Sequence, residues 1–186
     1  MPAPVLVAML GDLAPPELLD CVEQTGAADL VVVAGAWPNE QIHHSCQGFG
    51  VLTPSNEEAG FLNIQFAHSI FPEHVPPGFK MLKAMLGGAA NPQVCELNDQ
   101  QLTELAFSKI SKALGINTAP ERTWVHRIPN GVPQYLVGHM NRVDAAQTAV
   151  SRQLPGLHLA GESFFGIGLN PALRHSLVLG SSVRVV

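Results

Sequence analysis

Three neighbouring segments decide the fold of this chain: GFGVLTP (Gly48–Pro54), GFLNIQFAHSIF (Gly60–Phe71) and GFKMLKAMLGG (Gly78–Gly88). Each is rich in aromatic and β-branched residues and is bounded by turn residues, a pattern typical of β-strands. The sections between them, Ser55–Gly60 and Pro72–Gly78, have the length of hairpin loops and are too short for crossover helices. The stretch therefore predicts three strands of an antiparallel sheet.

An amphipathic helix is expected after these strands. Asn98 and Gln101 have the spacing of a capping box, and Gly115 is placed to end the helix. Between them, apolar residues from Leu102 to Leu114 recur at helical spacing and form one stripe. The pattern predicts a helix over Asn98–Leu114.

Shorter strand and helix pieces are expected on both flanks. An apolar run of this length, bounded by turn residues, is the form of a strand covered on both faces. The expected fold class is therefore mixed, α/β with α+β character, in which βα pieces at both ends enclose the antiparallel sheet. The flanking pieces are a strand at Pro4–Leu10, a helix at Pro15–Gln24 closed by Gly26, a second apolar run at Asp29–Trp37, a strand at Glu121–Ile128, a turn at Pro129–Pro133, a helix at Gly138–Gln153, a buried strand at Gly156–Ala160 and a helix at Pro171–Leu179.

Composition excludes several classes of protein. The 186 residues are 46% hydrophobic with a net charge of -5, and no basic cluster suggests nucleic acid or an anionic membrane as a partner. The longest apolar runs, such as Leu30–Ala36, are far below the roughly 20 residues that a transmembrane helix needs. The N-terminus lacks the basic start of a secretory signal, so a cytoplasmic location is expected, with peripheral membrane association left open.

Cysteine and histidine spacing suggests no disulfide and no metal site. Cys21, Cys46 and Cys95 are far apart and form no C-x-x-C pair, so they are expected to be reduced, structural thiols. The histidines do not cluster with the spacing of ligands.

The segment LHLAGESFFGIGL (Leu157–Leu169) joins an apolar run to an acidic turn and several glycines. A serine nucleophile elbow is excluded, because Phe165 stands where that motif has glycine and no acidic residue follows Glu162. A dinucleotide-binding GxGxxG motif is also excluded, because Pro171 occupies its third glycine position. No catalytic residue is predicted here.

Five blocks, taken together and in this order, resemble the protoporphyrinogen oxidase branch of the flavin-containing amine-oxidase superfamily. The combination of PQY-x-x-GH with LAG-x-S-x-x-G-x-G is specific to that branch, and the blocks cover most of the chain from Gly48 onward. They are GFGVLTPSNE (Gly48–Glu57), SIFPEHVPPG (Ser69–Gly78), Gly87–Gly88, IPNGVPQYLVGH (Ile128–His139) and GLHLAGESFFGIGL (Gly156–Leu169).

The resemblance implies a two-part FAD domain with a substrate domain inserted into it. Residues 1–28 are then a residual strand and helix of the FAD domain, residues 29–135 the substrate-binding domain, and residues 136–186 the returning C-terminal FAD-binding segment. The family's N-terminal FAD half, which carries the GxGxxG motif, does not occur in this sequence. The chain is therefore expected to be a C-terminal, incomplete part of such an enzyme.

The returning segment is expected to contact the cofactor FAD through Gly161, Glu162, Gly166, Gly168 and Leu169. Glycines allow close approach of the main chain to a flat ring, and a helix beginning near Gly168 directs N–H groups and a positive dipole end toward it. Glu162 has two alternative roles, beside the ribityl phosphate or as a cap of the helix N-terminus.

The resemblance places Pro133, Gln134 and Tyr135 near the flavin and the substrate cavity. It also implies the six-electron oxidation of protoporphyrinogen IX to protoporphyrin IX, with FAD as hydride acceptor and dioxygen as the oxidant that regenerates it. His74 departs from the family, which usually has Arg at this position, and this weakens recognition of a substrate propionate there.

Two alternatives remain open from the sequence. One is a non-catalytic binding or assembly module that pairs with a separate FAD-binding chain. The other is a different oxidoreductase of the same superfamily, such as an amine oxidase or a carotenoid-desaturase-like enzyme.

Overall fold

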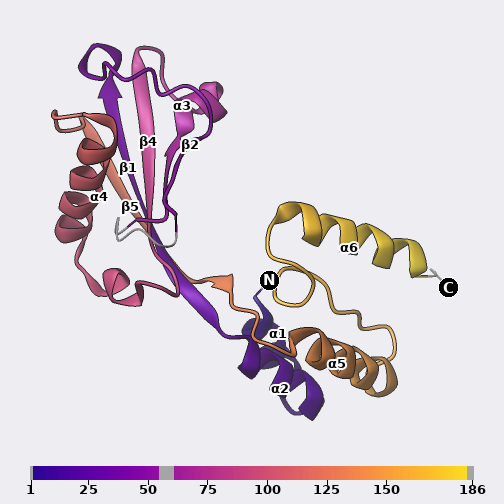
Figure 1. The fold of residues 1–186 in the computed structure, drawn as a ribbon. Coiled ribbons are helices and arrows are strands. Elements are labelled where there is room, and N and C mark those ends of the chain that lie inside the picture. The colour runs from indigo at the N-terminus through magenta and orange to yellow at the C-terminus, as the bar shows by residue number, and fades with distance from the viewer. Residues whose placement is uncertain (1, 55–60, 184–186) are drawn as a thin grey trace. The chain divides into compact units, whose positions relative to one another are not determined.

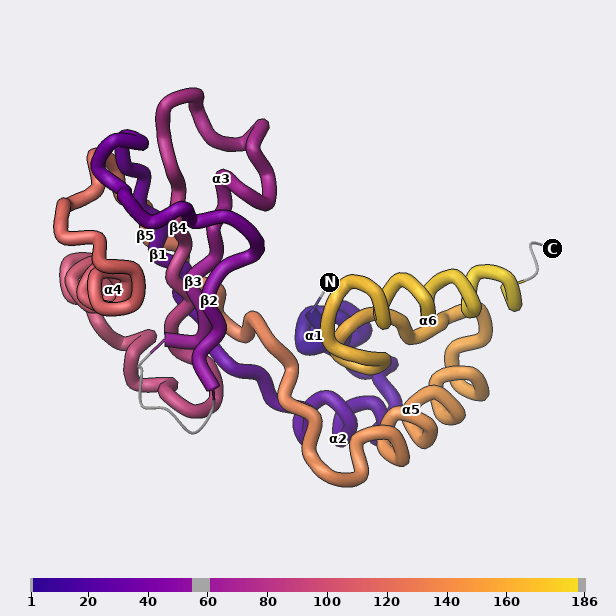
Figure 2. Tube along the Cα trace, turned by 45° about the horizontal axis from the view of Figure 1, so that its top comes forward, coloured from indigo at the N-terminus to yellow at the C-terminus, as the bar shows by residue number. Residues whose placement is uncertain are grey.

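The computed structural model describes residues 2–54 and 61–183, which form two compact units. Unit 1 is built from both ends of the chain, residues up to Ala27 and from Val132 onward, and unit 2 is Ala28–Gly131 (Figures 1 and 2). The elements in chain order are α1 (Ala3–Leu10), η1 (Gly11–Leu13), α2 (Pro16–Thr25), β1 (Ala27–Pro38), η2 (Asn39–Gln41), β2 (Gly50–Leu52), β3 (Asn63–Phe66), α3 (Ala67–Ile70), η3 (Pro72–His74), β4 (Phe79–Gly87), η4 (Pro92–Glu96), α4 (Asp99–Leu114), β5 (Arg122–Pro133), α5 (His139–Gln153) and α6 (Leu169–Ser182).

Unit 2 is a five-stranded sheet in the order β2-β3-β4-β1-β5. The pairs β2–β3, β3–β4 and β4–β1 are antiparallel. The register aligns Val51 with Ile64, Ile64 with Ala84, and Ala84 with Val33, so one row of apolar side chains crosses four strands. The three predicted antiparallel strands are confirmed, but the second ends at Phe66, and Ala67–Ile70 forms helix α3. The expected hairpin loop at Ser55–Gly60 lies outside the described residues.

Helix α4 covers one face of this sheet (Figure 1). Its buried residues Leu102, Ala106, Ile110 and Leu114 recur at helical spacing and join the strand residues in one hydrophobic core. The predicted capping box is present: Gln101 N donates to Asn98 Oδ1 at 2.9 Å, and Asn98 N donates to Gln101 Oε1 at 3.1 Å. Gly115 ends the helix in the left-handed conformation, as the sequence predicts.

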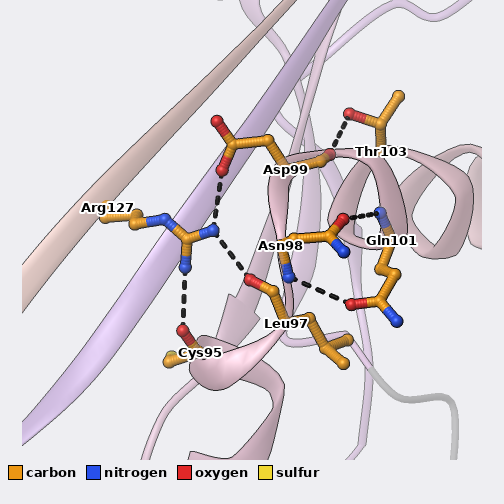
Figure 3. Close-up of polar contacts among 7 residues, drawn as sticks. All are labelled: Cys95, Leu97, Asn98, Asp99, Gln101, Thr103 and Arg127. Atoms are coloured by element: carbon orange, nitrogen blue, oxygen red, sulfur yellow. Dashed lines mark hydrogen bonds and ion pairs between the residues drawn. The ribbon is translucent and has the colours of Figure 1, made fainter.

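Arg127 on β5 binds the segment that leads into α4 (Figure 3). Its guanidinium donates to the carbonyl oxygens of Cys95 at 2.8 Å and Leu97 at 2.7 Å, and to Asp99 Oδ1 at 2.7 Å. One side chain therefore satisfies acceptors on η4, on the linker and on the first turn of α4.

Unit 1 is mainly helical. Helix α2 packs against α5, and α1 also packs against α2. Their apolar faces meet the loop before α6 in a second hydrophobic core, whose buried residues are Ala3, Leu18, Cys21, Val143, Ala146, Val150, Leu159 and Phe164.

The strand predicted at Pro4–Leu10 is wrong, because this segment is helix α1. A short run of apolar residues does not distinguish a strand from a buried helix by its length alone. The residues that pack into the core, Ala3, Leu6, Val7 and Leu10, have helical spacing, whereas Val5 and Met9 are exposed. The proline in the first turn is compatible with a helix start.

Two further predictions are corrected. Gly156–Ala160 forms no strand; Leu159 is buried in the helical core of unit 1 from an irregular segment. The turn expected at Pro129–Pro133 is also wrong, because β5 continues through it. Asn130 has a φ of 51°, a conformation common in turns, so it makes the strand locally irregular without ending it.

Candidate functional site

A glycine-rich loop, Gly161–Gly168, connects the core of unit 1 to α6. Gly161, Gly166 and Gly168 have φ values of 98°, 85° and 104°, a region that side-chain-bearing residues rarely adopt. The loop begins as a tight turn, in which the N–H groups of Phe164 and Phe165 both donate to the carbonyl oxygen of Gly161. A Cβ at Gly161 would meet no atom within 4 Å, so the main chain there borders open space.

Tyr135 holds this loop through its hydroxyl group. The hydroxyl accepts a hydrogen bond from Gly166 N at 2.9 Å and donates one to the carbonyl oxygen of Glu162. Burial raises the pKa of Tyr135 above its ordinary value, partly offset by the Gly166 N–H, and the Glu162 carboxylate raises it further. The hydroxyl therefore keeps its proton at neutral pH and remains a donor.

His139, at the first position of α5, holds the same loop at a third point. Its ring stacks on that of Tyr135 with centroids 3.7 Å apart, and its Nε2 lies 3.0 Å from the carbonyl oxygen of Phe164. Because a carbonyl oxygen only accepts, Nε2 must carry the hydrogen. Nδ1 lies 3.5 Å from Thr25 Oγ1, whose hydroxyl donates to the carbonyl oxygen of Cys21 at 2.6 Å.

Glu162 lies at the beginning of α6. Its Oε1 accepts a hydrogen bond from Gly168 N at 3.0 Å, and Gly168 is the N-cap residue of that helix. This contact with the start of α6 is the one that a capping role would require, and both expected roles of Glu162 stay predictions. The next N–H groups, those of Leu169 and Asn170, belong to the first turn, where a helix leaves donors without an intrahelical partner.

Pro133 and Gln134 precede Tyr135 in the sequence, and neither forms a hydrogen bond to the loop Gly161–Gly168. Pro133 is buried at the end of β5. The Gln134 amide nitrogen lies 3.1 Å and 3.2 Å from the carbonyl oxygens of Val132 and Pro133, so its donors are used locally. The structure therefore brings the expected cofactor residues and Tyr135 together, and it leaves the other two expected substrate residues outside that group.

Other reactive side chains form no second site in the described parts of the chain. Cys21 and Cys46 are buried free thiols, Cys95 is a partly buried one, and Ser163 Oγ accepts a hydrogen bond from Ala3 N at 3.4 Å. Residues 2–54 and 61–183 contain no group of three His, Cys, Asp or Glu placed to hold a metal ion. Within the same residues, no helix is both long and apolar enough to cross a bilayer.

A family model for flavin containing amine oxidoreductases matches residues 2–176 of this chain. The chain belongs to the flavin-containing amine oxidoreductase family. Coproporphyrinogen III oxidase of Bacillus subtilis (strain 168) is 27% identical over 90% of the chain and 35% of its own length. Protoporphyrinogen oxidase of Homo sapiens is 31% identical over 89% of the chain and 36% of its own length.

Two solved structures have a similar fold. A structure from Exiguobacterium sp. 255-15 assigned to protoporphyrinogen oxidase covers 98% of the chain and 39% of its own length, with a TM-score of 0.76 and 24% identity. Reduced UDP-galactopyranose mutase covers 98% of the chain and 41% of its own length, with a TM-score of 0.64 and 16% identity. The mixed fold with an antiparallel sheet is therefore confirmed.

The chain spans about a third of the length of the curated relatives it matches. FAD is the cofactor that membership of this family indicates. The loop fits part of such a cofactor: Gly161 leaves open space beside the main chain, and N–H groups at the start of α6 can donate to carbonyl oxygens. The loop Gly161–Gly168 contains no Lys or Arg, and the Glu162 carboxylate would repel an anion. The loop therefore fits the ring and the hydroxyl-bearing parts of FAD better than its pyrophosphate.

The supporting residues His139, Thr25 and Cys21 were not among the residues expected from sequence. Cys21 and Thr25 are on α2, far along the chain from the loop that they help to hold. The block PQY-x-x-GH contains both Tyr135 and His139, and its four-residue separation is the only sequence signal that could have linked them.

Proposed function

We propose that this chain is the part of a porphyrinogen-oxidising flavoprotein that contacts the flavin through the loop Gly161–Gly168. The proposed reaction is FAD-dependent oxidation of protoporphyrinogen IX to protoporphyrin IX, with dioxygen as electron acceptor. One observation carries the proposal: in a member of a flavin family, a glycine-rich loop leads directly to the N-terminus of a helix and is held in place by Tyr135 and the buried His139. The names of the relatives support a porphyrinogen as substrate.

The residues of this chain would bind and orient the cofactor. Bound FAD would supply the hydride acceptor for each oxidation step. Gly161 and Gly168 would let the main chain approach the ring, and the N–H groups of Leu169 and Asn170 would donate to oxygen atoms that gain negative charge on reduction. Glu162 would accept hydrogen bonds from hydroxyl groups. The substrate role of Pro133, Gln134 and Tyr135 stays a prediction.

Two measurements test this function. Titration of the chain with FAD should quench flavin fluorescence, and Gly161→Val should weaken this binding, because its side chain would fill the open space and strain the main chain. Gly156→Val is a matched control, since Gly156 also has a positive φ, of 90°, but lies outside the loop. Protoporphyrin fluorescence after addition of protoporphyrinogen IX then reports oxidation. Equal FAD affinity of the two variants would contradict the proposal.

A second candidate function, an assembly module for a separate FAD-binding chain, is favoured by α6. None of the α6 residues is buried, and Leu169, Leu173 and Leu177 are 71%, 51% and 75% exposed at successive helical turns. An apolar stripe of this kind is typical of a helix that packs against another protein surface.

The assembly module predicts a complex with the N-terminal FAD-binding portion of a protoporphyrinogen oxidase. Light scattering should detect a one-to-one complex, and Leu173→Glu should weaken it by about tenfold or more, because a charge would enter an apolar interface. Ser182→Glu, on the same helix but on the face opposite the stripe, is the control. Absence of a complex with the unaltered chain would exclude this function.

A further inference from the structure

Two aromatic side chains fix three main-chain groups of the loop Gly161–Gly168. Tyr135 binds the carbonyl oxygen of Glu162 and the N–H of Gly166, and His139 binds the carbonyl oxygen of Phe164. The three groups belong to alternate residues of the loop. The two rings are themselves stacked, with an angle of 11° between their planes. We call Tyr135 and His139 the two-ring brace.

The two-ring brace is anchored in the core of unit 1. His139 is only 4% exposed, and its second nitrogen faces the hydroxyl of Thr25, the last residue of α2. That hydroxyl donates to the carbonyl oxygen of Cys21 in the same helix. Loop residues with glycine at three positions of positive φ lose much conformational freedom when they are ordered. Because the brace orders the loop when the protein folds, this loss of conformational entropy does not weaken the later binding of a ligand.

The hydrogen bonds of Tyr135 also argue against contact with a substrate. A phenolic hydroxyl has one hydrogen, and the carbonyl oxygen of Glu162 takes it. A substrate carboxylate could gain no hydrogen bond from Tyr135 unless the loop first lost one.

We propose that Tyr135 and His139 are positioning residues for the cofactor loop and not contacts of the porphyrinogen. This inference rests on the proposed function, since it takes FAD as the ligand of the loop. It assigns the PQY-x-x-GH block to the flavin side of the site.

The test uses the full chain, three substitutions in the two-ring brace and one control substitution. Tyr135→Phe keeps the ring and its stacking but removes the hydroxyl. His139→Gln keeps an N–H donor near the position of Nε2, whereas His139→Leu removes it. Ser151→Ala is the control, because it removes a hydroxyl on α5 that bonds only to the carbonyl oxygen of Gln147. For each variant we would measure amide hydrogen exchange of Gly166, FAD affinity by flavin fluorescence, and protoporphyrin IX affinity by porphyrin fluorescence.

The expected result is faster exchange at Gly166 and about tenfold weaker FAD binding in Tyr135→Phe, the effect of losing two hydrogen bonds that order the loop. Protoporphyrin affinity should not change, and His139→Gln should bind FAD more tightly than His139→Leu. Weaker protoporphyrin binding with unchanged FAD binding would overturn the inference, as would unchanged exchange at Gly166. If the unaltered chain binds no FAD, the proposed function loses its cofactor, and exchange at Gly166 alone decides whether the brace orders the loop.

Discussion

Arg127 shows how much a single side chain contributes to unit 2. It donates to three oxygen atoms at the entrance to α4, and its removal would leave two carbonyl groups and the Asp99 carboxylate without this partner (Figure 3). We expect Arg127→Met to lower the free energy of unfolding by about 1–3 kcal/mol, the value of hydrogen bonds that involve a charged group. Urea unfolding measures the loss. Arg122→Met, at the first residue of the same strand, should cost much less, and equal losses would contradict this role.

The three thiols give a prediction about pH. Burial raises the pKa of Cys21, Cys46 and Cys95 above the ordinary value, so the folded state favours the protonated thiols. Their contribution to stability is complete below the ordinary thiol pKa of about 8.5 and is lost as the pH rises through the raised values. Thermal unfolding temperature should therefore fall on the alkaline side of this range. Cys21→Ala should reduce the fall, and an unchanged pH dependence would contradict the assignment.

Single residues also show where sequence reasoning is limited. The glycines and Glu162 could be assigned to one loop because they are neighbours in the sequence and have recognisable turn chemistry. The hydroxyl of Tyr135 is held by residues more than twenty positions away, and no local pattern encodes such contacts. The resemblance placed Tyr135 near the flavin, while its hydrogen bonds to the loop required the structure.

Among the elements, α4 is the one whose ends are specified most completely. Asn98→Ala removes the side chain that accepts from Gln101 N, and we expect a loss of about 1 kcal/mol in the free energy of unfolding. The reciprocal Gln101 contact to Asn98 N would remain. Gln100→Ala is the control, because Gln100 bonds only to Glu104 on the exposed face of the helix. A loss in the control as large as that in Asn98→Ala would argue against the capping role.

Elements with a recognisable residue pattern could be predicted from the sequence, whereas the structure of the uniformly apolar segment Pro4–Leu10 could not. The apolar stripe of α4 recurs at helical spacing, and the three strand segments are short, rich in aromatic and β-branched residues and bounded by turn residues, so both could be recognised from sequence. In Pro4–Leu10 nearly every residue is apolar, so the helical face is hidden among exposed apolar residues such as Met9. Gly156–Ala160 is too short for any period to be read.

At the scale of the whole chain, one unit is continuous and the other is built from both ends. Such a division depends on contacts between distant segments, for example α2 with α5, and composition alone does not predict it. The resemblance supplied a two-segment FAD domain as an expectation, and the functional names of the units remain a proposal.

Unit 2 should fold without the rest of the chain. Its hydrophobic core draws every buried residue from Ala28–Gly131, including Trp37, Leu82 and Leu102, and its helix α4 carries its own cap. A domain of this size with one core normally unfolds in a single transition. We therefore expect the excised segment Ala28–Gly131 to melt cooperatively by circular dichroism. In this segment Leu102→Ala should lower the free energy of unfolding by about 2–5 kcal/mol, because Leu102 is fully buried against the sheet. The exposed Leu52→Ala should cost far less. A segment without a cooperative transition would show that unit 2 needs unit 1 in order to fold.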